Sequence, residues 1–269
     1  MHRWLLALAL LCAWCTAAHA GAWTLKKHKW QIISQFEIAH AARGYDAHAS
    51  ADAPIRFDKR FSKTLAEYGL SDRITLVLAP EYSTAVSAWN GGAPVQAIDM
   101  GMEAGARLRL SDGFGVTSLQ ATLKYAGPFD LSHGPIQKYD SIGRGATRTE
   151  ELRLLYGTGF KLFGRDGFAD AEAAERFITA PRPDETDIDL TAGLWFGTKT
   201  MVMAQSFNVI SGGGAEPPYT YFREHKLELS LVRCLSDRWS VQIGAFVAPM
   251  GQNTVAEQGF MLSLWNRRL

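Results

Sequence analysis

The chain has 269 residues, 47% of them hydrophobic and 20% charged, with a formal net charge of +1. This length suits one domain, and the near-neutral charge excludes the basic field that attracts nucleic acid. Three cysteines are too few for a disulfide-stapled scaffold.

Residues 1–20 have the pattern of a secretory signal peptide. An apolar run over 4–14 is followed by Ala18-His19-Ala20, which fits the small-residue rule for cleavage. The run is too short to span a bilayer as a helix. We therefore expect a signal peptide at 1–20 and one mature domain at 21–269.

The mature chain is divided by turns into segments that alternate between apolar and polar residues. We expect strands at 30–43, 55–68, 73–87, 99–110, 117–125, 150–163, 168–178, 186–196, 201–211, 219–235, 239–249 and 257–269. A period of two places successive side chains on opposite faces of a strand.

The segment 99–125 alternates most clearly. Ser111–Gly115 provides a tight turn, and on both sides of it every second residue is apolar or small. These residues are Met100, Met102, Ala104, Ala106, Leu108, Leu110, Thr117, Leu119, Ala121, Leu123 and Tyr125. A soluble sheet with one wet face and a transmembrane hairpin with one lipid-facing side both fit this pattern.

The segment 168–178 is the least typical strand. Its sequence ADAEAAERF has the composition of a helix, which is the alternative prediction. We expect a strand because the barrel needs one here, with Asp170, Glu172 and Arg176 facing inward.

The connections alternate in length, and this favours the membrane interpretation. Short turns are expected at 69–72, 111–115, 164–167, 197–200 and 235–238, and longer loops at 44–53, 88–95, 127–149, 179–185, 211–218 and 249–256. Bacterial outer-membrane barrels have short periplasmic turns, longer outer loops and an even strand number. Aromatic residues near the predicted strand ends suit an interfacial girdle. The predicted fold class is an all-β, transmembrane antiparallel up-and-down β-barrel of about twelve strands, in the cell outer membrane; a periplasmic β-protein is the alternative.

The polar positions of these strands are predicted to line the lumen. They are Arg56, Asp58, Arg60, Glu81, Asp99, Glu103, Arg107, Arg109, Lys124, Glu151, Arg153, Asp187 and Asp189. Eight-stranded barrels are filled by side chains and sixteen strands leave an aqueous channel, so a twelve-stranded bore can be open or filled. The lining is therefore either a narrow path for solutes or an ion-paired interior that only stabilises the barrel.

Several short motifs resemble a known group of proteins. The mature start GAWT, the turns Leu70-Ser71-Asp72-Arg73 and Leu235-Ser236-Asp237-Arg238-Trp239, and the last strand GFMLSLWNRRL resemble proteobacterial outer-membrane barrels of the aromatic-degradation (MetA-pathway-like) or XagA type. The resemblance implies an outer-membrane location, with outer-membrane lipid and the barrel-assembly machinery as partners, and a small-molecule or polysaccharide substrate.

Three functions remain open. The first is a passive channel or transporter for small hydrophilic or amphipathic molecules. The second is export of surface polysaccharide or a biofilm role, which rests on the resemblance. The third is a membrane-embedded lipid hydrolase using outward histidines such as His40 and His225, although we expect no enzyme, catalytic residue, metal or cofactor.

Overall fold

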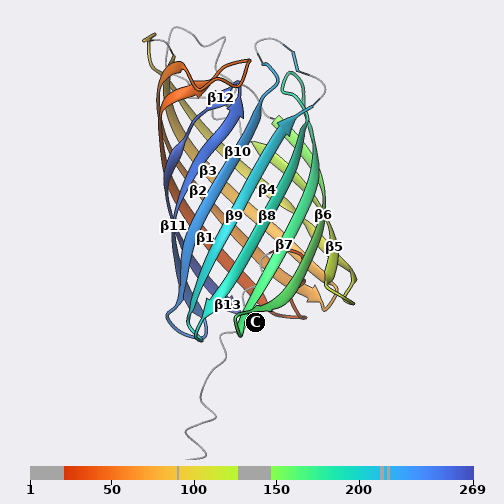
Figure 1. The fold of residues 1–269 in the computed structure, drawn as a ribbon. Coiled ribbons are helices and arrows are strands. Elements are labelled where there is room, and N and C mark those ends of the chain that lie inside the picture. The colour runs from red at the N-terminus through yellow and green to blue at the C-terminus, as the bar shows by residue number, and fades with distance from the viewer. Residues whose placement is uncertain (1–20, 90, 127–146, 213–214, 217–218) are drawn as a thin grey trace, which may run out of the picture.

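The computed structural model describes residues 21–89, 91–126, 147–212, 215–216 and 219–269. They form a closed antiparallel β-barrel (Figure 1). Over these residues, no helix has the length and apolar character needed to cross a membrane. The predicted signal peptide (1–20) and most of the predicted loop at 127–149 lie outside the described residues.

The described residues form thirteen strands, one of which has only two residues. They are β1 (Trp30–Tyr45), β2 (Ala53–Ser71), β3 (Ile74–Trp89), β4 (Val95–Ser111), β5 (Val116–Ala126), β6 (Thr147–Leu162), β7 (Arg165–Ile178), β8 (Glu185–Phe196), β9 (Thr200–Ser211), β10 (Arg223–Cys234), β11 (Trp239–Gln252), β12 (Thr254–Val255) and β13 (Gln258–Arg268).

The barrel closes because β1 pairs with both β2 and β13. Every other long strand pairs with its neighbours in chain order, and the short β12 extends the ladder of β1. The twelve long strands therefore form one up-and-down barrel, which confirms the predicted fold class. Closure leaves no free edge among the long strands, and a free edge is a site of uncontrolled strand pairing.

The connections separate into two rims, as predicted. The turns 72–73, 112–115, 163–164, 197–199 and 235–238 lie at one end, together with the C-terminus (Figure 1). We call this end the short-turn rim. The described connections 46–52 and 179–184 lie at the opposite end, which we call the long-loop rim.

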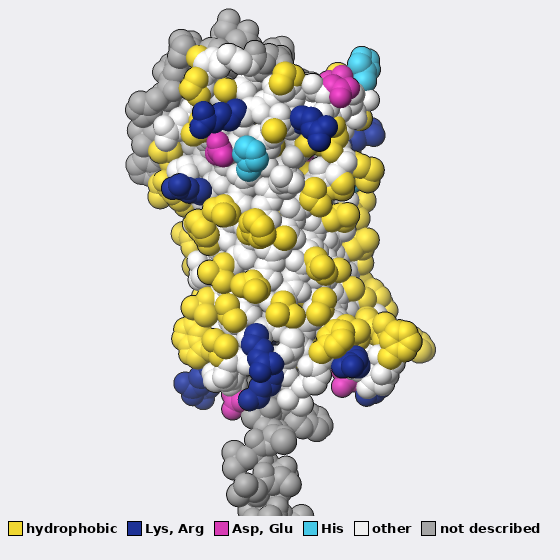
Figure 2. Space-filling model, turned by 60° about the vertical axis from the view of Figure 1, so that its left-hand side comes forward, with side chains coloured by type: hydrophobic (Ala, Val, Ile, Leu, Met, Phe, Trp, Pro, Cys, Tyr) yellow, Lys and Arg dark blue, Asp and Glu magenta, His cyan; other side chains and the backbone are white. Residues whose placement is uncertain are grey.

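The outer wall carries an apolar belt (Figure 2). Leu108, Leu123, Leu154 and Leu229 are between 42% and 62% exposed although they belong to regular strands. Their neighbours in the chain are buried inside, as at Ser118 and Thr122 of β5. The hairpin at 99–125 thus has its two faces as predicted. Exposed aromatic residues also occur near strand ends, namely Tyr68, Trp89, Tyr125, Tyr221 and Trp239, whereas the exposed Tyr82 and Tyr156 lie within their strands.

The segment 168–178 is a strand, as predicted, and pairs along its length with β6 and β8. Asp170 is buried on the inner face and Ala171 is exposed on the outer face. The helix propensity of its alanines and glutamates is overridden because two neighbouring strands offer continuous backbone partners.

The two faces of β2 are the reverse of the prediction. Arg56, Asp58 and Arg60 face outward and do not line the lumen. The pairing with β1 sets this register, since Arg60 lies opposite the outward Ile38. The inner face of β2 instead contributes Phe57 to an apolar cluster beneath the long-loop rim. Alternation along β2 revealed its two faces but could not say which of them was inside.

Candidate site in the barrel lumen

The N-terminal segment, residues 21–29, enters the barrel at the short-turn end, with 21–25 inside the bore and 26–29 at the rim. Ala22 is completely buried, its amide donates to Asp170 Oδ2 at 2.9 Å and its carbonyl accepts from Ser118 Oγ at 2.5 Å. The Trp23 carbonyl accepts from Arg107 Nη1 at 3.1 Å. The start of the segment is therefore fixed against three strands of the inner wall.

The rest of the segment follows the wall down to the rim. The Leu25 amide donates to Thr75 Oγ1 at 2.8 Å, and the Lys27 amide donates to Asp72 Oδ1 at 2.9 Å. Gly69 exchanges backbone hydrogen bonds with His28 and Lys29. A Cβ atom at Gly69 would overlap the Lys26 carbonyl, so this close approach requires glycine.

Apolar side chains fill the bore beside this segment. The cluster, which we call the floor, comprises Ile33, Phe168, Met201, Met203, Val232 and Trp265, with Trp23, Leu65 and Trp195 packed against it. The Trp23 ring meets Phe168 edge-on, with ring centroids 6.1 Å apart. It also lies over Gly157, where a Cβ would overlap it. The N-terminal segment and the floor together constrict the bore at the short-turn rim.

Above the floor, two arginines gather acidic side chains from β6, β7 and β8. Arg153 contacts Glu151 at 2.7 Å, Glu172 and Asp189 at 2.8 Å, and Asp187 at 3.3 Å. Arg176 contacts Glu151 and Asp187 at 2.8 Å and Glu185 at 3.5 Å. Five carboxylates thus surround two guanidinium groups, and Asp187 Oδ1 has no hydrogen-bond donor among the described residues.

A second group of ion pairs lies on β2 to β5. Arg107 contacts Glu67 at 2.9 Å, and its Nε and Nη2 donate to Gln120 Oε1. Lys63 contacts Glu103 at 3.2 Å. Lys124 pairs with Glu81. Each ion pair joins strands that are two apart in the wall, β2 with β4 or β3 with β5, across the inner face.

A third group lies under the long-loop rim. Glu257 is almost completely buried and contacts Lys226 at 2.5 Å and Lys59 at 3.3 Å. The Lys226 ammonium also lies 4.8 Å from the Phe246 ring centroid, within the range of a cation–π contact. The upper part of the lumen is therefore narrowed on the side of β1, β2 and β11.

Between the floor and this upper group lies a chamber of about 470 Å³. Its lining has eight carboxylates (Glu37, Glu103, Glu151, Asp170, Glu172, Asp189, Glu224, Glu228) and five cationic side chains (Lys63, Arg107, Arg153, Arg176, Lys226). Apolar residues line the rest, namely Ile33, Phe61, Leu65, Val77, Phe168, Met203, Phe207, Val209 and Trp265. The chamber is therefore amphipathic, and acids outnumber bases.

Three chamber carboxylates, Glu37, Asp170 and Glu228, stand apart from the ion pairs, and Asp170 instead accepts the hydrogen bond from the Ala22 amide. Glu37 accepts a hydrogen bond from Gln35 Nε2 at 2.5 Å, and Glu228 accepts one from Gln242 Nε2 at 3.5 Å. Neither forms an ion pair with any residue in the described ranges. They are the acidic groups that a positively charged solute could approach without displacing a bound arginine or lysine.

Most of the predicted lumen residues face inward. Glu103, Arg107, Glu151, Arg153, Asp187 and Asp189 belong to the clusters described above, and Glu81 pairs with Lys124. Asp99 also lies on the inner face, opposite Ser83. Arg109 lies lower, at the short-turn rim, 3.6 Å from Asp112. Only Arg56, Asp58 and Arg60 of the predicted lining are on the wrong side.

Two features of the site were not predicted. Glu67 belongs to the strand whose two faces were reversed, and Glu257, the first residue of the last predicted strand, was not among the predicted lumen residues. The N-terminal segment precedes the first predicted strand, and the sequence did not predict that it enters the barrel. Its basic and aromatic composition gives no period, and only the closed wall around it shows where it packs.

The two outward histidines do not meet. His40 is on β1 and contacts Asp58 at 3.3 Å, whereas His225 is on β10 and contacts Asn208 Oδ1 at 2.9 Å. Ser206 Oγ interacts with Asn208 and not with a histidine in the described contacts. Within the described ranges, no three or more His, Cys, Asp or Glu side chains are grouped to hold a metal ion.

Comparison with known proteins places the fold among outer-membrane β-barrels. An outer membrane channel from Pseudomonas putida F1 superposes with a TM-score of 0.65 at 12% identity, covering 94% of this chain and all of that one. The β domain of the Bordetella autotransporter BrkA gives 0.59 at 11% identity, covering 90% of this chain and all of that one. The translocator domain of the autotransporter NalP from Neisseria meningitidis gives 0.56 at 9% identity, covering 94% and 91%.

At these identities the likeness concerns the fold alone. No family model and no curated protein matches the chain. The predicted class, an outer-membrane β-barrel, is confirmed at the level of fold, and the MetA-pathway-like or XagA-type family stays a prediction.

Proposed function

We propose that the protein is an outer-membrane channel for small hydrophilic or amphipathic molecules, with a preference for cations. The observation that carries the proposal is the chamber, whose lining holds eight carboxylates against five cationic side chains beside an apolar wall. A low-dielectric wall focuses the field of such a lining, so cations concentrate in the chamber and anions are repelled.

The location follows from the outer wall. The apolar belt suits a lipid bilayer, and short periplasmic turns with longer outer loops are the rule for bacterial outer-membrane barrels. The short-turn rim then faces the periplasm and the long-loop rim the exterior. In this orientation the N-terminal segment lies at the periplasmic mouth, where it limits the size of what passes.

The substrate class follows from the two sides of the chamber. Glu37 and Glu228 are available to a positively charged group, while Phe207 and Val209 offer apolar contact. Small organic cations can contact both the acidic and the apolar side of the chamber. Inorganic cations can contact the acidic side only.

Planar-bilayer recording of the purified protein tests the proposal. We expect small currents and a reversal potential that favours K⁺ over Cl⁻ in a KCl gradient. The double variant Glu37→Gln/Glu228→Gln removes two charges without breaking an ion pair, so it should reduce cation preference while conductance persists. Glu150→Gln, which changes an exposed outward carboxylate, is the matched control.

Two results would contradict this function. One is anion preference in the unmodified protein. The other is absence of current both from the mature chain and from a variant lacking residues 22–28, since that variant removes the part of the constriction that the N-terminal segment forms. Unchanged selectivity in the double variant would refute the role assigned to the chamber acids.

A further inference from the structure

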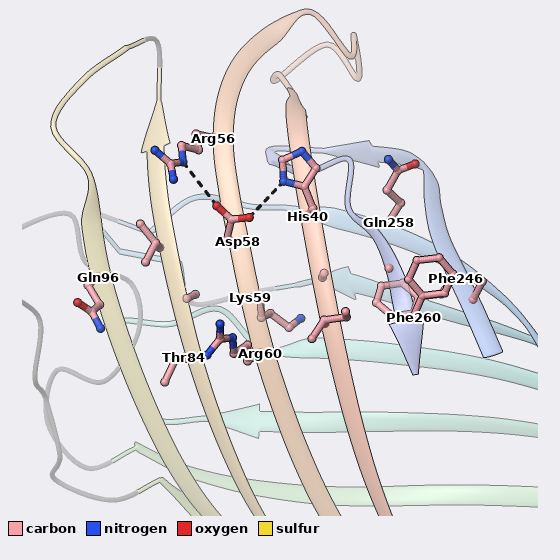
Figure 3. A pocket seen from close by; sticks show the side chains of 16 residues that line it. His40, Arg56, Asp58, Lys59, Arg60, Thr84, Gln96, Phe246, Gln258 and Phe260 are labelled. Atoms are coloured by element: carbon pink, nitrogen blue, oxygen red, sulfur yellow. Dashed lines mark hydrogen bonds and ion pairs between the residues drawn. The ribbon is translucent and has the colours of Figure 1, made fainter. Parts of the chain in front are cut away.

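The outward charges of β2 form part of a polar cluster on the lipid-facing wall. It comprises His40 on β1 and Arg56, Asp58 and Arg60 on β2 (Figure 3). Asp58 contacts His40 Nδ1 at 3.3 Å and Arg56 Nε at 3.5 Å. All of these side chains point away from the lumen and lie toward the long-loop end of their strands.

The level of the cluster is set by its neighbours. Exposed Ile38 lies directly opposite Arg60, with exposed Phe260 beside it on β13, and exposed Tyr82 lies one outward position nearer the short-turn rim on β3. Charged side chains on the lipid face cost much less stability at the interface than at the bilayer centre. The cluster therefore lies at the outer edge of the apolar belt, where lipid headgroups begin.

The cluster carries an excess of positive charge. Asp58 is the one acidic side chain in it, and Arg60 forms no ion pair with any described residue. Arg56 meets Asp58 through Nε, which leaves its two terminal nitrogens pointing outward. Arginine presents a planar fork of donors that matches the oxygens of a phosphate group.

A hollow accompanies these charges. It has a volume of about 990 Å³ and crosses the wall from Gln96 on β4 to Ala245 on β11. His40, Asp58 and Gln258 share one row of its lining, and Arg60, Ile38 and Phe260 share the next row toward the short-turn rim. One surface thus offers phosphate ligands next to apolar contact, which is the arrangement of an anionic lipid with its acyl chain toward the membrane core.

We propose that this hollow binds the phosphate group of an anionic glycolipid of the outer leaflet, through Arg56 and Arg60. Lipid A, which bears phosphates on a sugar backbone with several acyl chains, has this chemistry. The inference rests on the proposed outer-membrane orientation but not on channel activity. The protein can bind lipid without conducting ions, and it can conduct ions without binding lipid, so the two proposals can fail separately.

The test is native mass spectrometry of the purified full-length mature protein, titrated with Kdo₂-lipid A. We expect retained lipid on the unmodified protein and binding about tenfold or more weaker for Arg56→Gln/Arg60→Gln, because hydrogen bonds to charged groups are among the stronger ones. Arg148→Gln is the matched control, since Arg148 is an exposed arginine already paired with Glu150 at 3.0 Å. It should bind as the unmodified protein does.

A second arm separates phosphate recognition from acyl contact. Lipid A whose phosphates have been removed should bind about as weakly to the unmodified protein as intact lipid A binds to the double variant. Heat-modifiable migration on gels confirms that each variant is folded. Equal binding of intact lipid A by the double variant, equal binding of the dephosphorylated lipid, or an equal loss in Arg148→Gln would overturn the proposal. Self-association through this face would also overturn it. The sign would be a dimer of the unmodified protein that is lost in the double variant, together with no binding of lipid A.

Discussion

Substitution of Leu119 by arginine tests the lipid-facing assignment most directly. Leu119 points outward from β5, between Leu108 of β4 and Leu154 of β6 in the register. Four residues further along β5, Leu123 lies opposite Glu150, a charged outward residue that marks the edge of the apolar belt. Leu119 is therefore well inside the belt.

The magnitude follows from the strand geometry. Four residues span about 13 Å of strand at roughly 3.3 Å per residue. At a tilt of about 40° this is roughly 10 Å of depth, close to the middle of an apolar band about 25 Å tall. An arginine at this depth costs about 2–4 kcal/mol, whereas lumenal changes mainly affect selectivity.

The assay compares the heat-modifiable fraction and the urea midpoint in lipid vesicles. Gln205→Arg is the lumenal control, since Gln205 faces the chamber opposite Glu228 and an added arginine gains an acidic partner. We expect Leu119→Arg to lower both measures and Gln205→Arg to leave them nearly unchanged. A Leu119→Arg protein with the stability of the unmodified chain would refute the assigned membrane depth.

A cysteine scan distinguishes lipid from protein packing. After replacement of Cys234 by serine, single cysteines are placed from Val116 to Lys124. Odd positions should react only with lipid-soluble thiol reagents, because they face the bilayer. Even positions should react only with water-soluble ones, to the extent that the lumen admits them. Odd positions that resist both kinds of reagent would mean that the apolar face packs against protein.

Two further predictions concern the interior. Trp23→Ala removes the ring that packs on Phe168, so we expect larger single-channel conductance without loss of the heat-modifiable form; unchanged conductance would mean that the constriction lies elsewhere. Arg153→Met leaves four carboxylates without this partner and should cost about 3–5 kcal/mol, measured by urea unfolding against the exposed Arg148→Met control. A stability loss equal to that of the control would contradict this prediction. It would show that water solvates the four carboxylates well enough without Arg153.

The sequence by itself determined the architecture. Alternation with a period of two located the strands, and the contrast between short turns and long loops determined the two rims. This works because the wall of a membrane barrel separates lipid from the lumen. Each strand must therefore have apolar residues on the lipid side and polar residues on the lumenal side. Even the alanine- and glutamate-rich segment at 168–178 could be predicted as a strand, since an even strand number required it.

On β2 and β9, only the tertiary structure decided which face of the strand is inside. On β9, Met201 and Met203 point into the floor, and on β2 Arg56 and Arg60 point outward. Both strands alternate clearly, but alternation is symmetric under exchange of the two faces. The register with neighbouring strands, fixed by backbone hydrogen bonds around the closed wall, removes that symmetry.

The lumen depended on tertiary structure to a greater degree. The contacts of Ala22 with Ser118 and Asp170 join residues more than ninety positions apart. Arg153 likewise collects carboxylates from three strands, and its partners become neighbours only when β6, β7 and β8 pair in register. A local pattern records which side chains are polar. Their pairing follows from the strand register, and the filling of the bore by the N-terminal segment follows from closure of the wall around it.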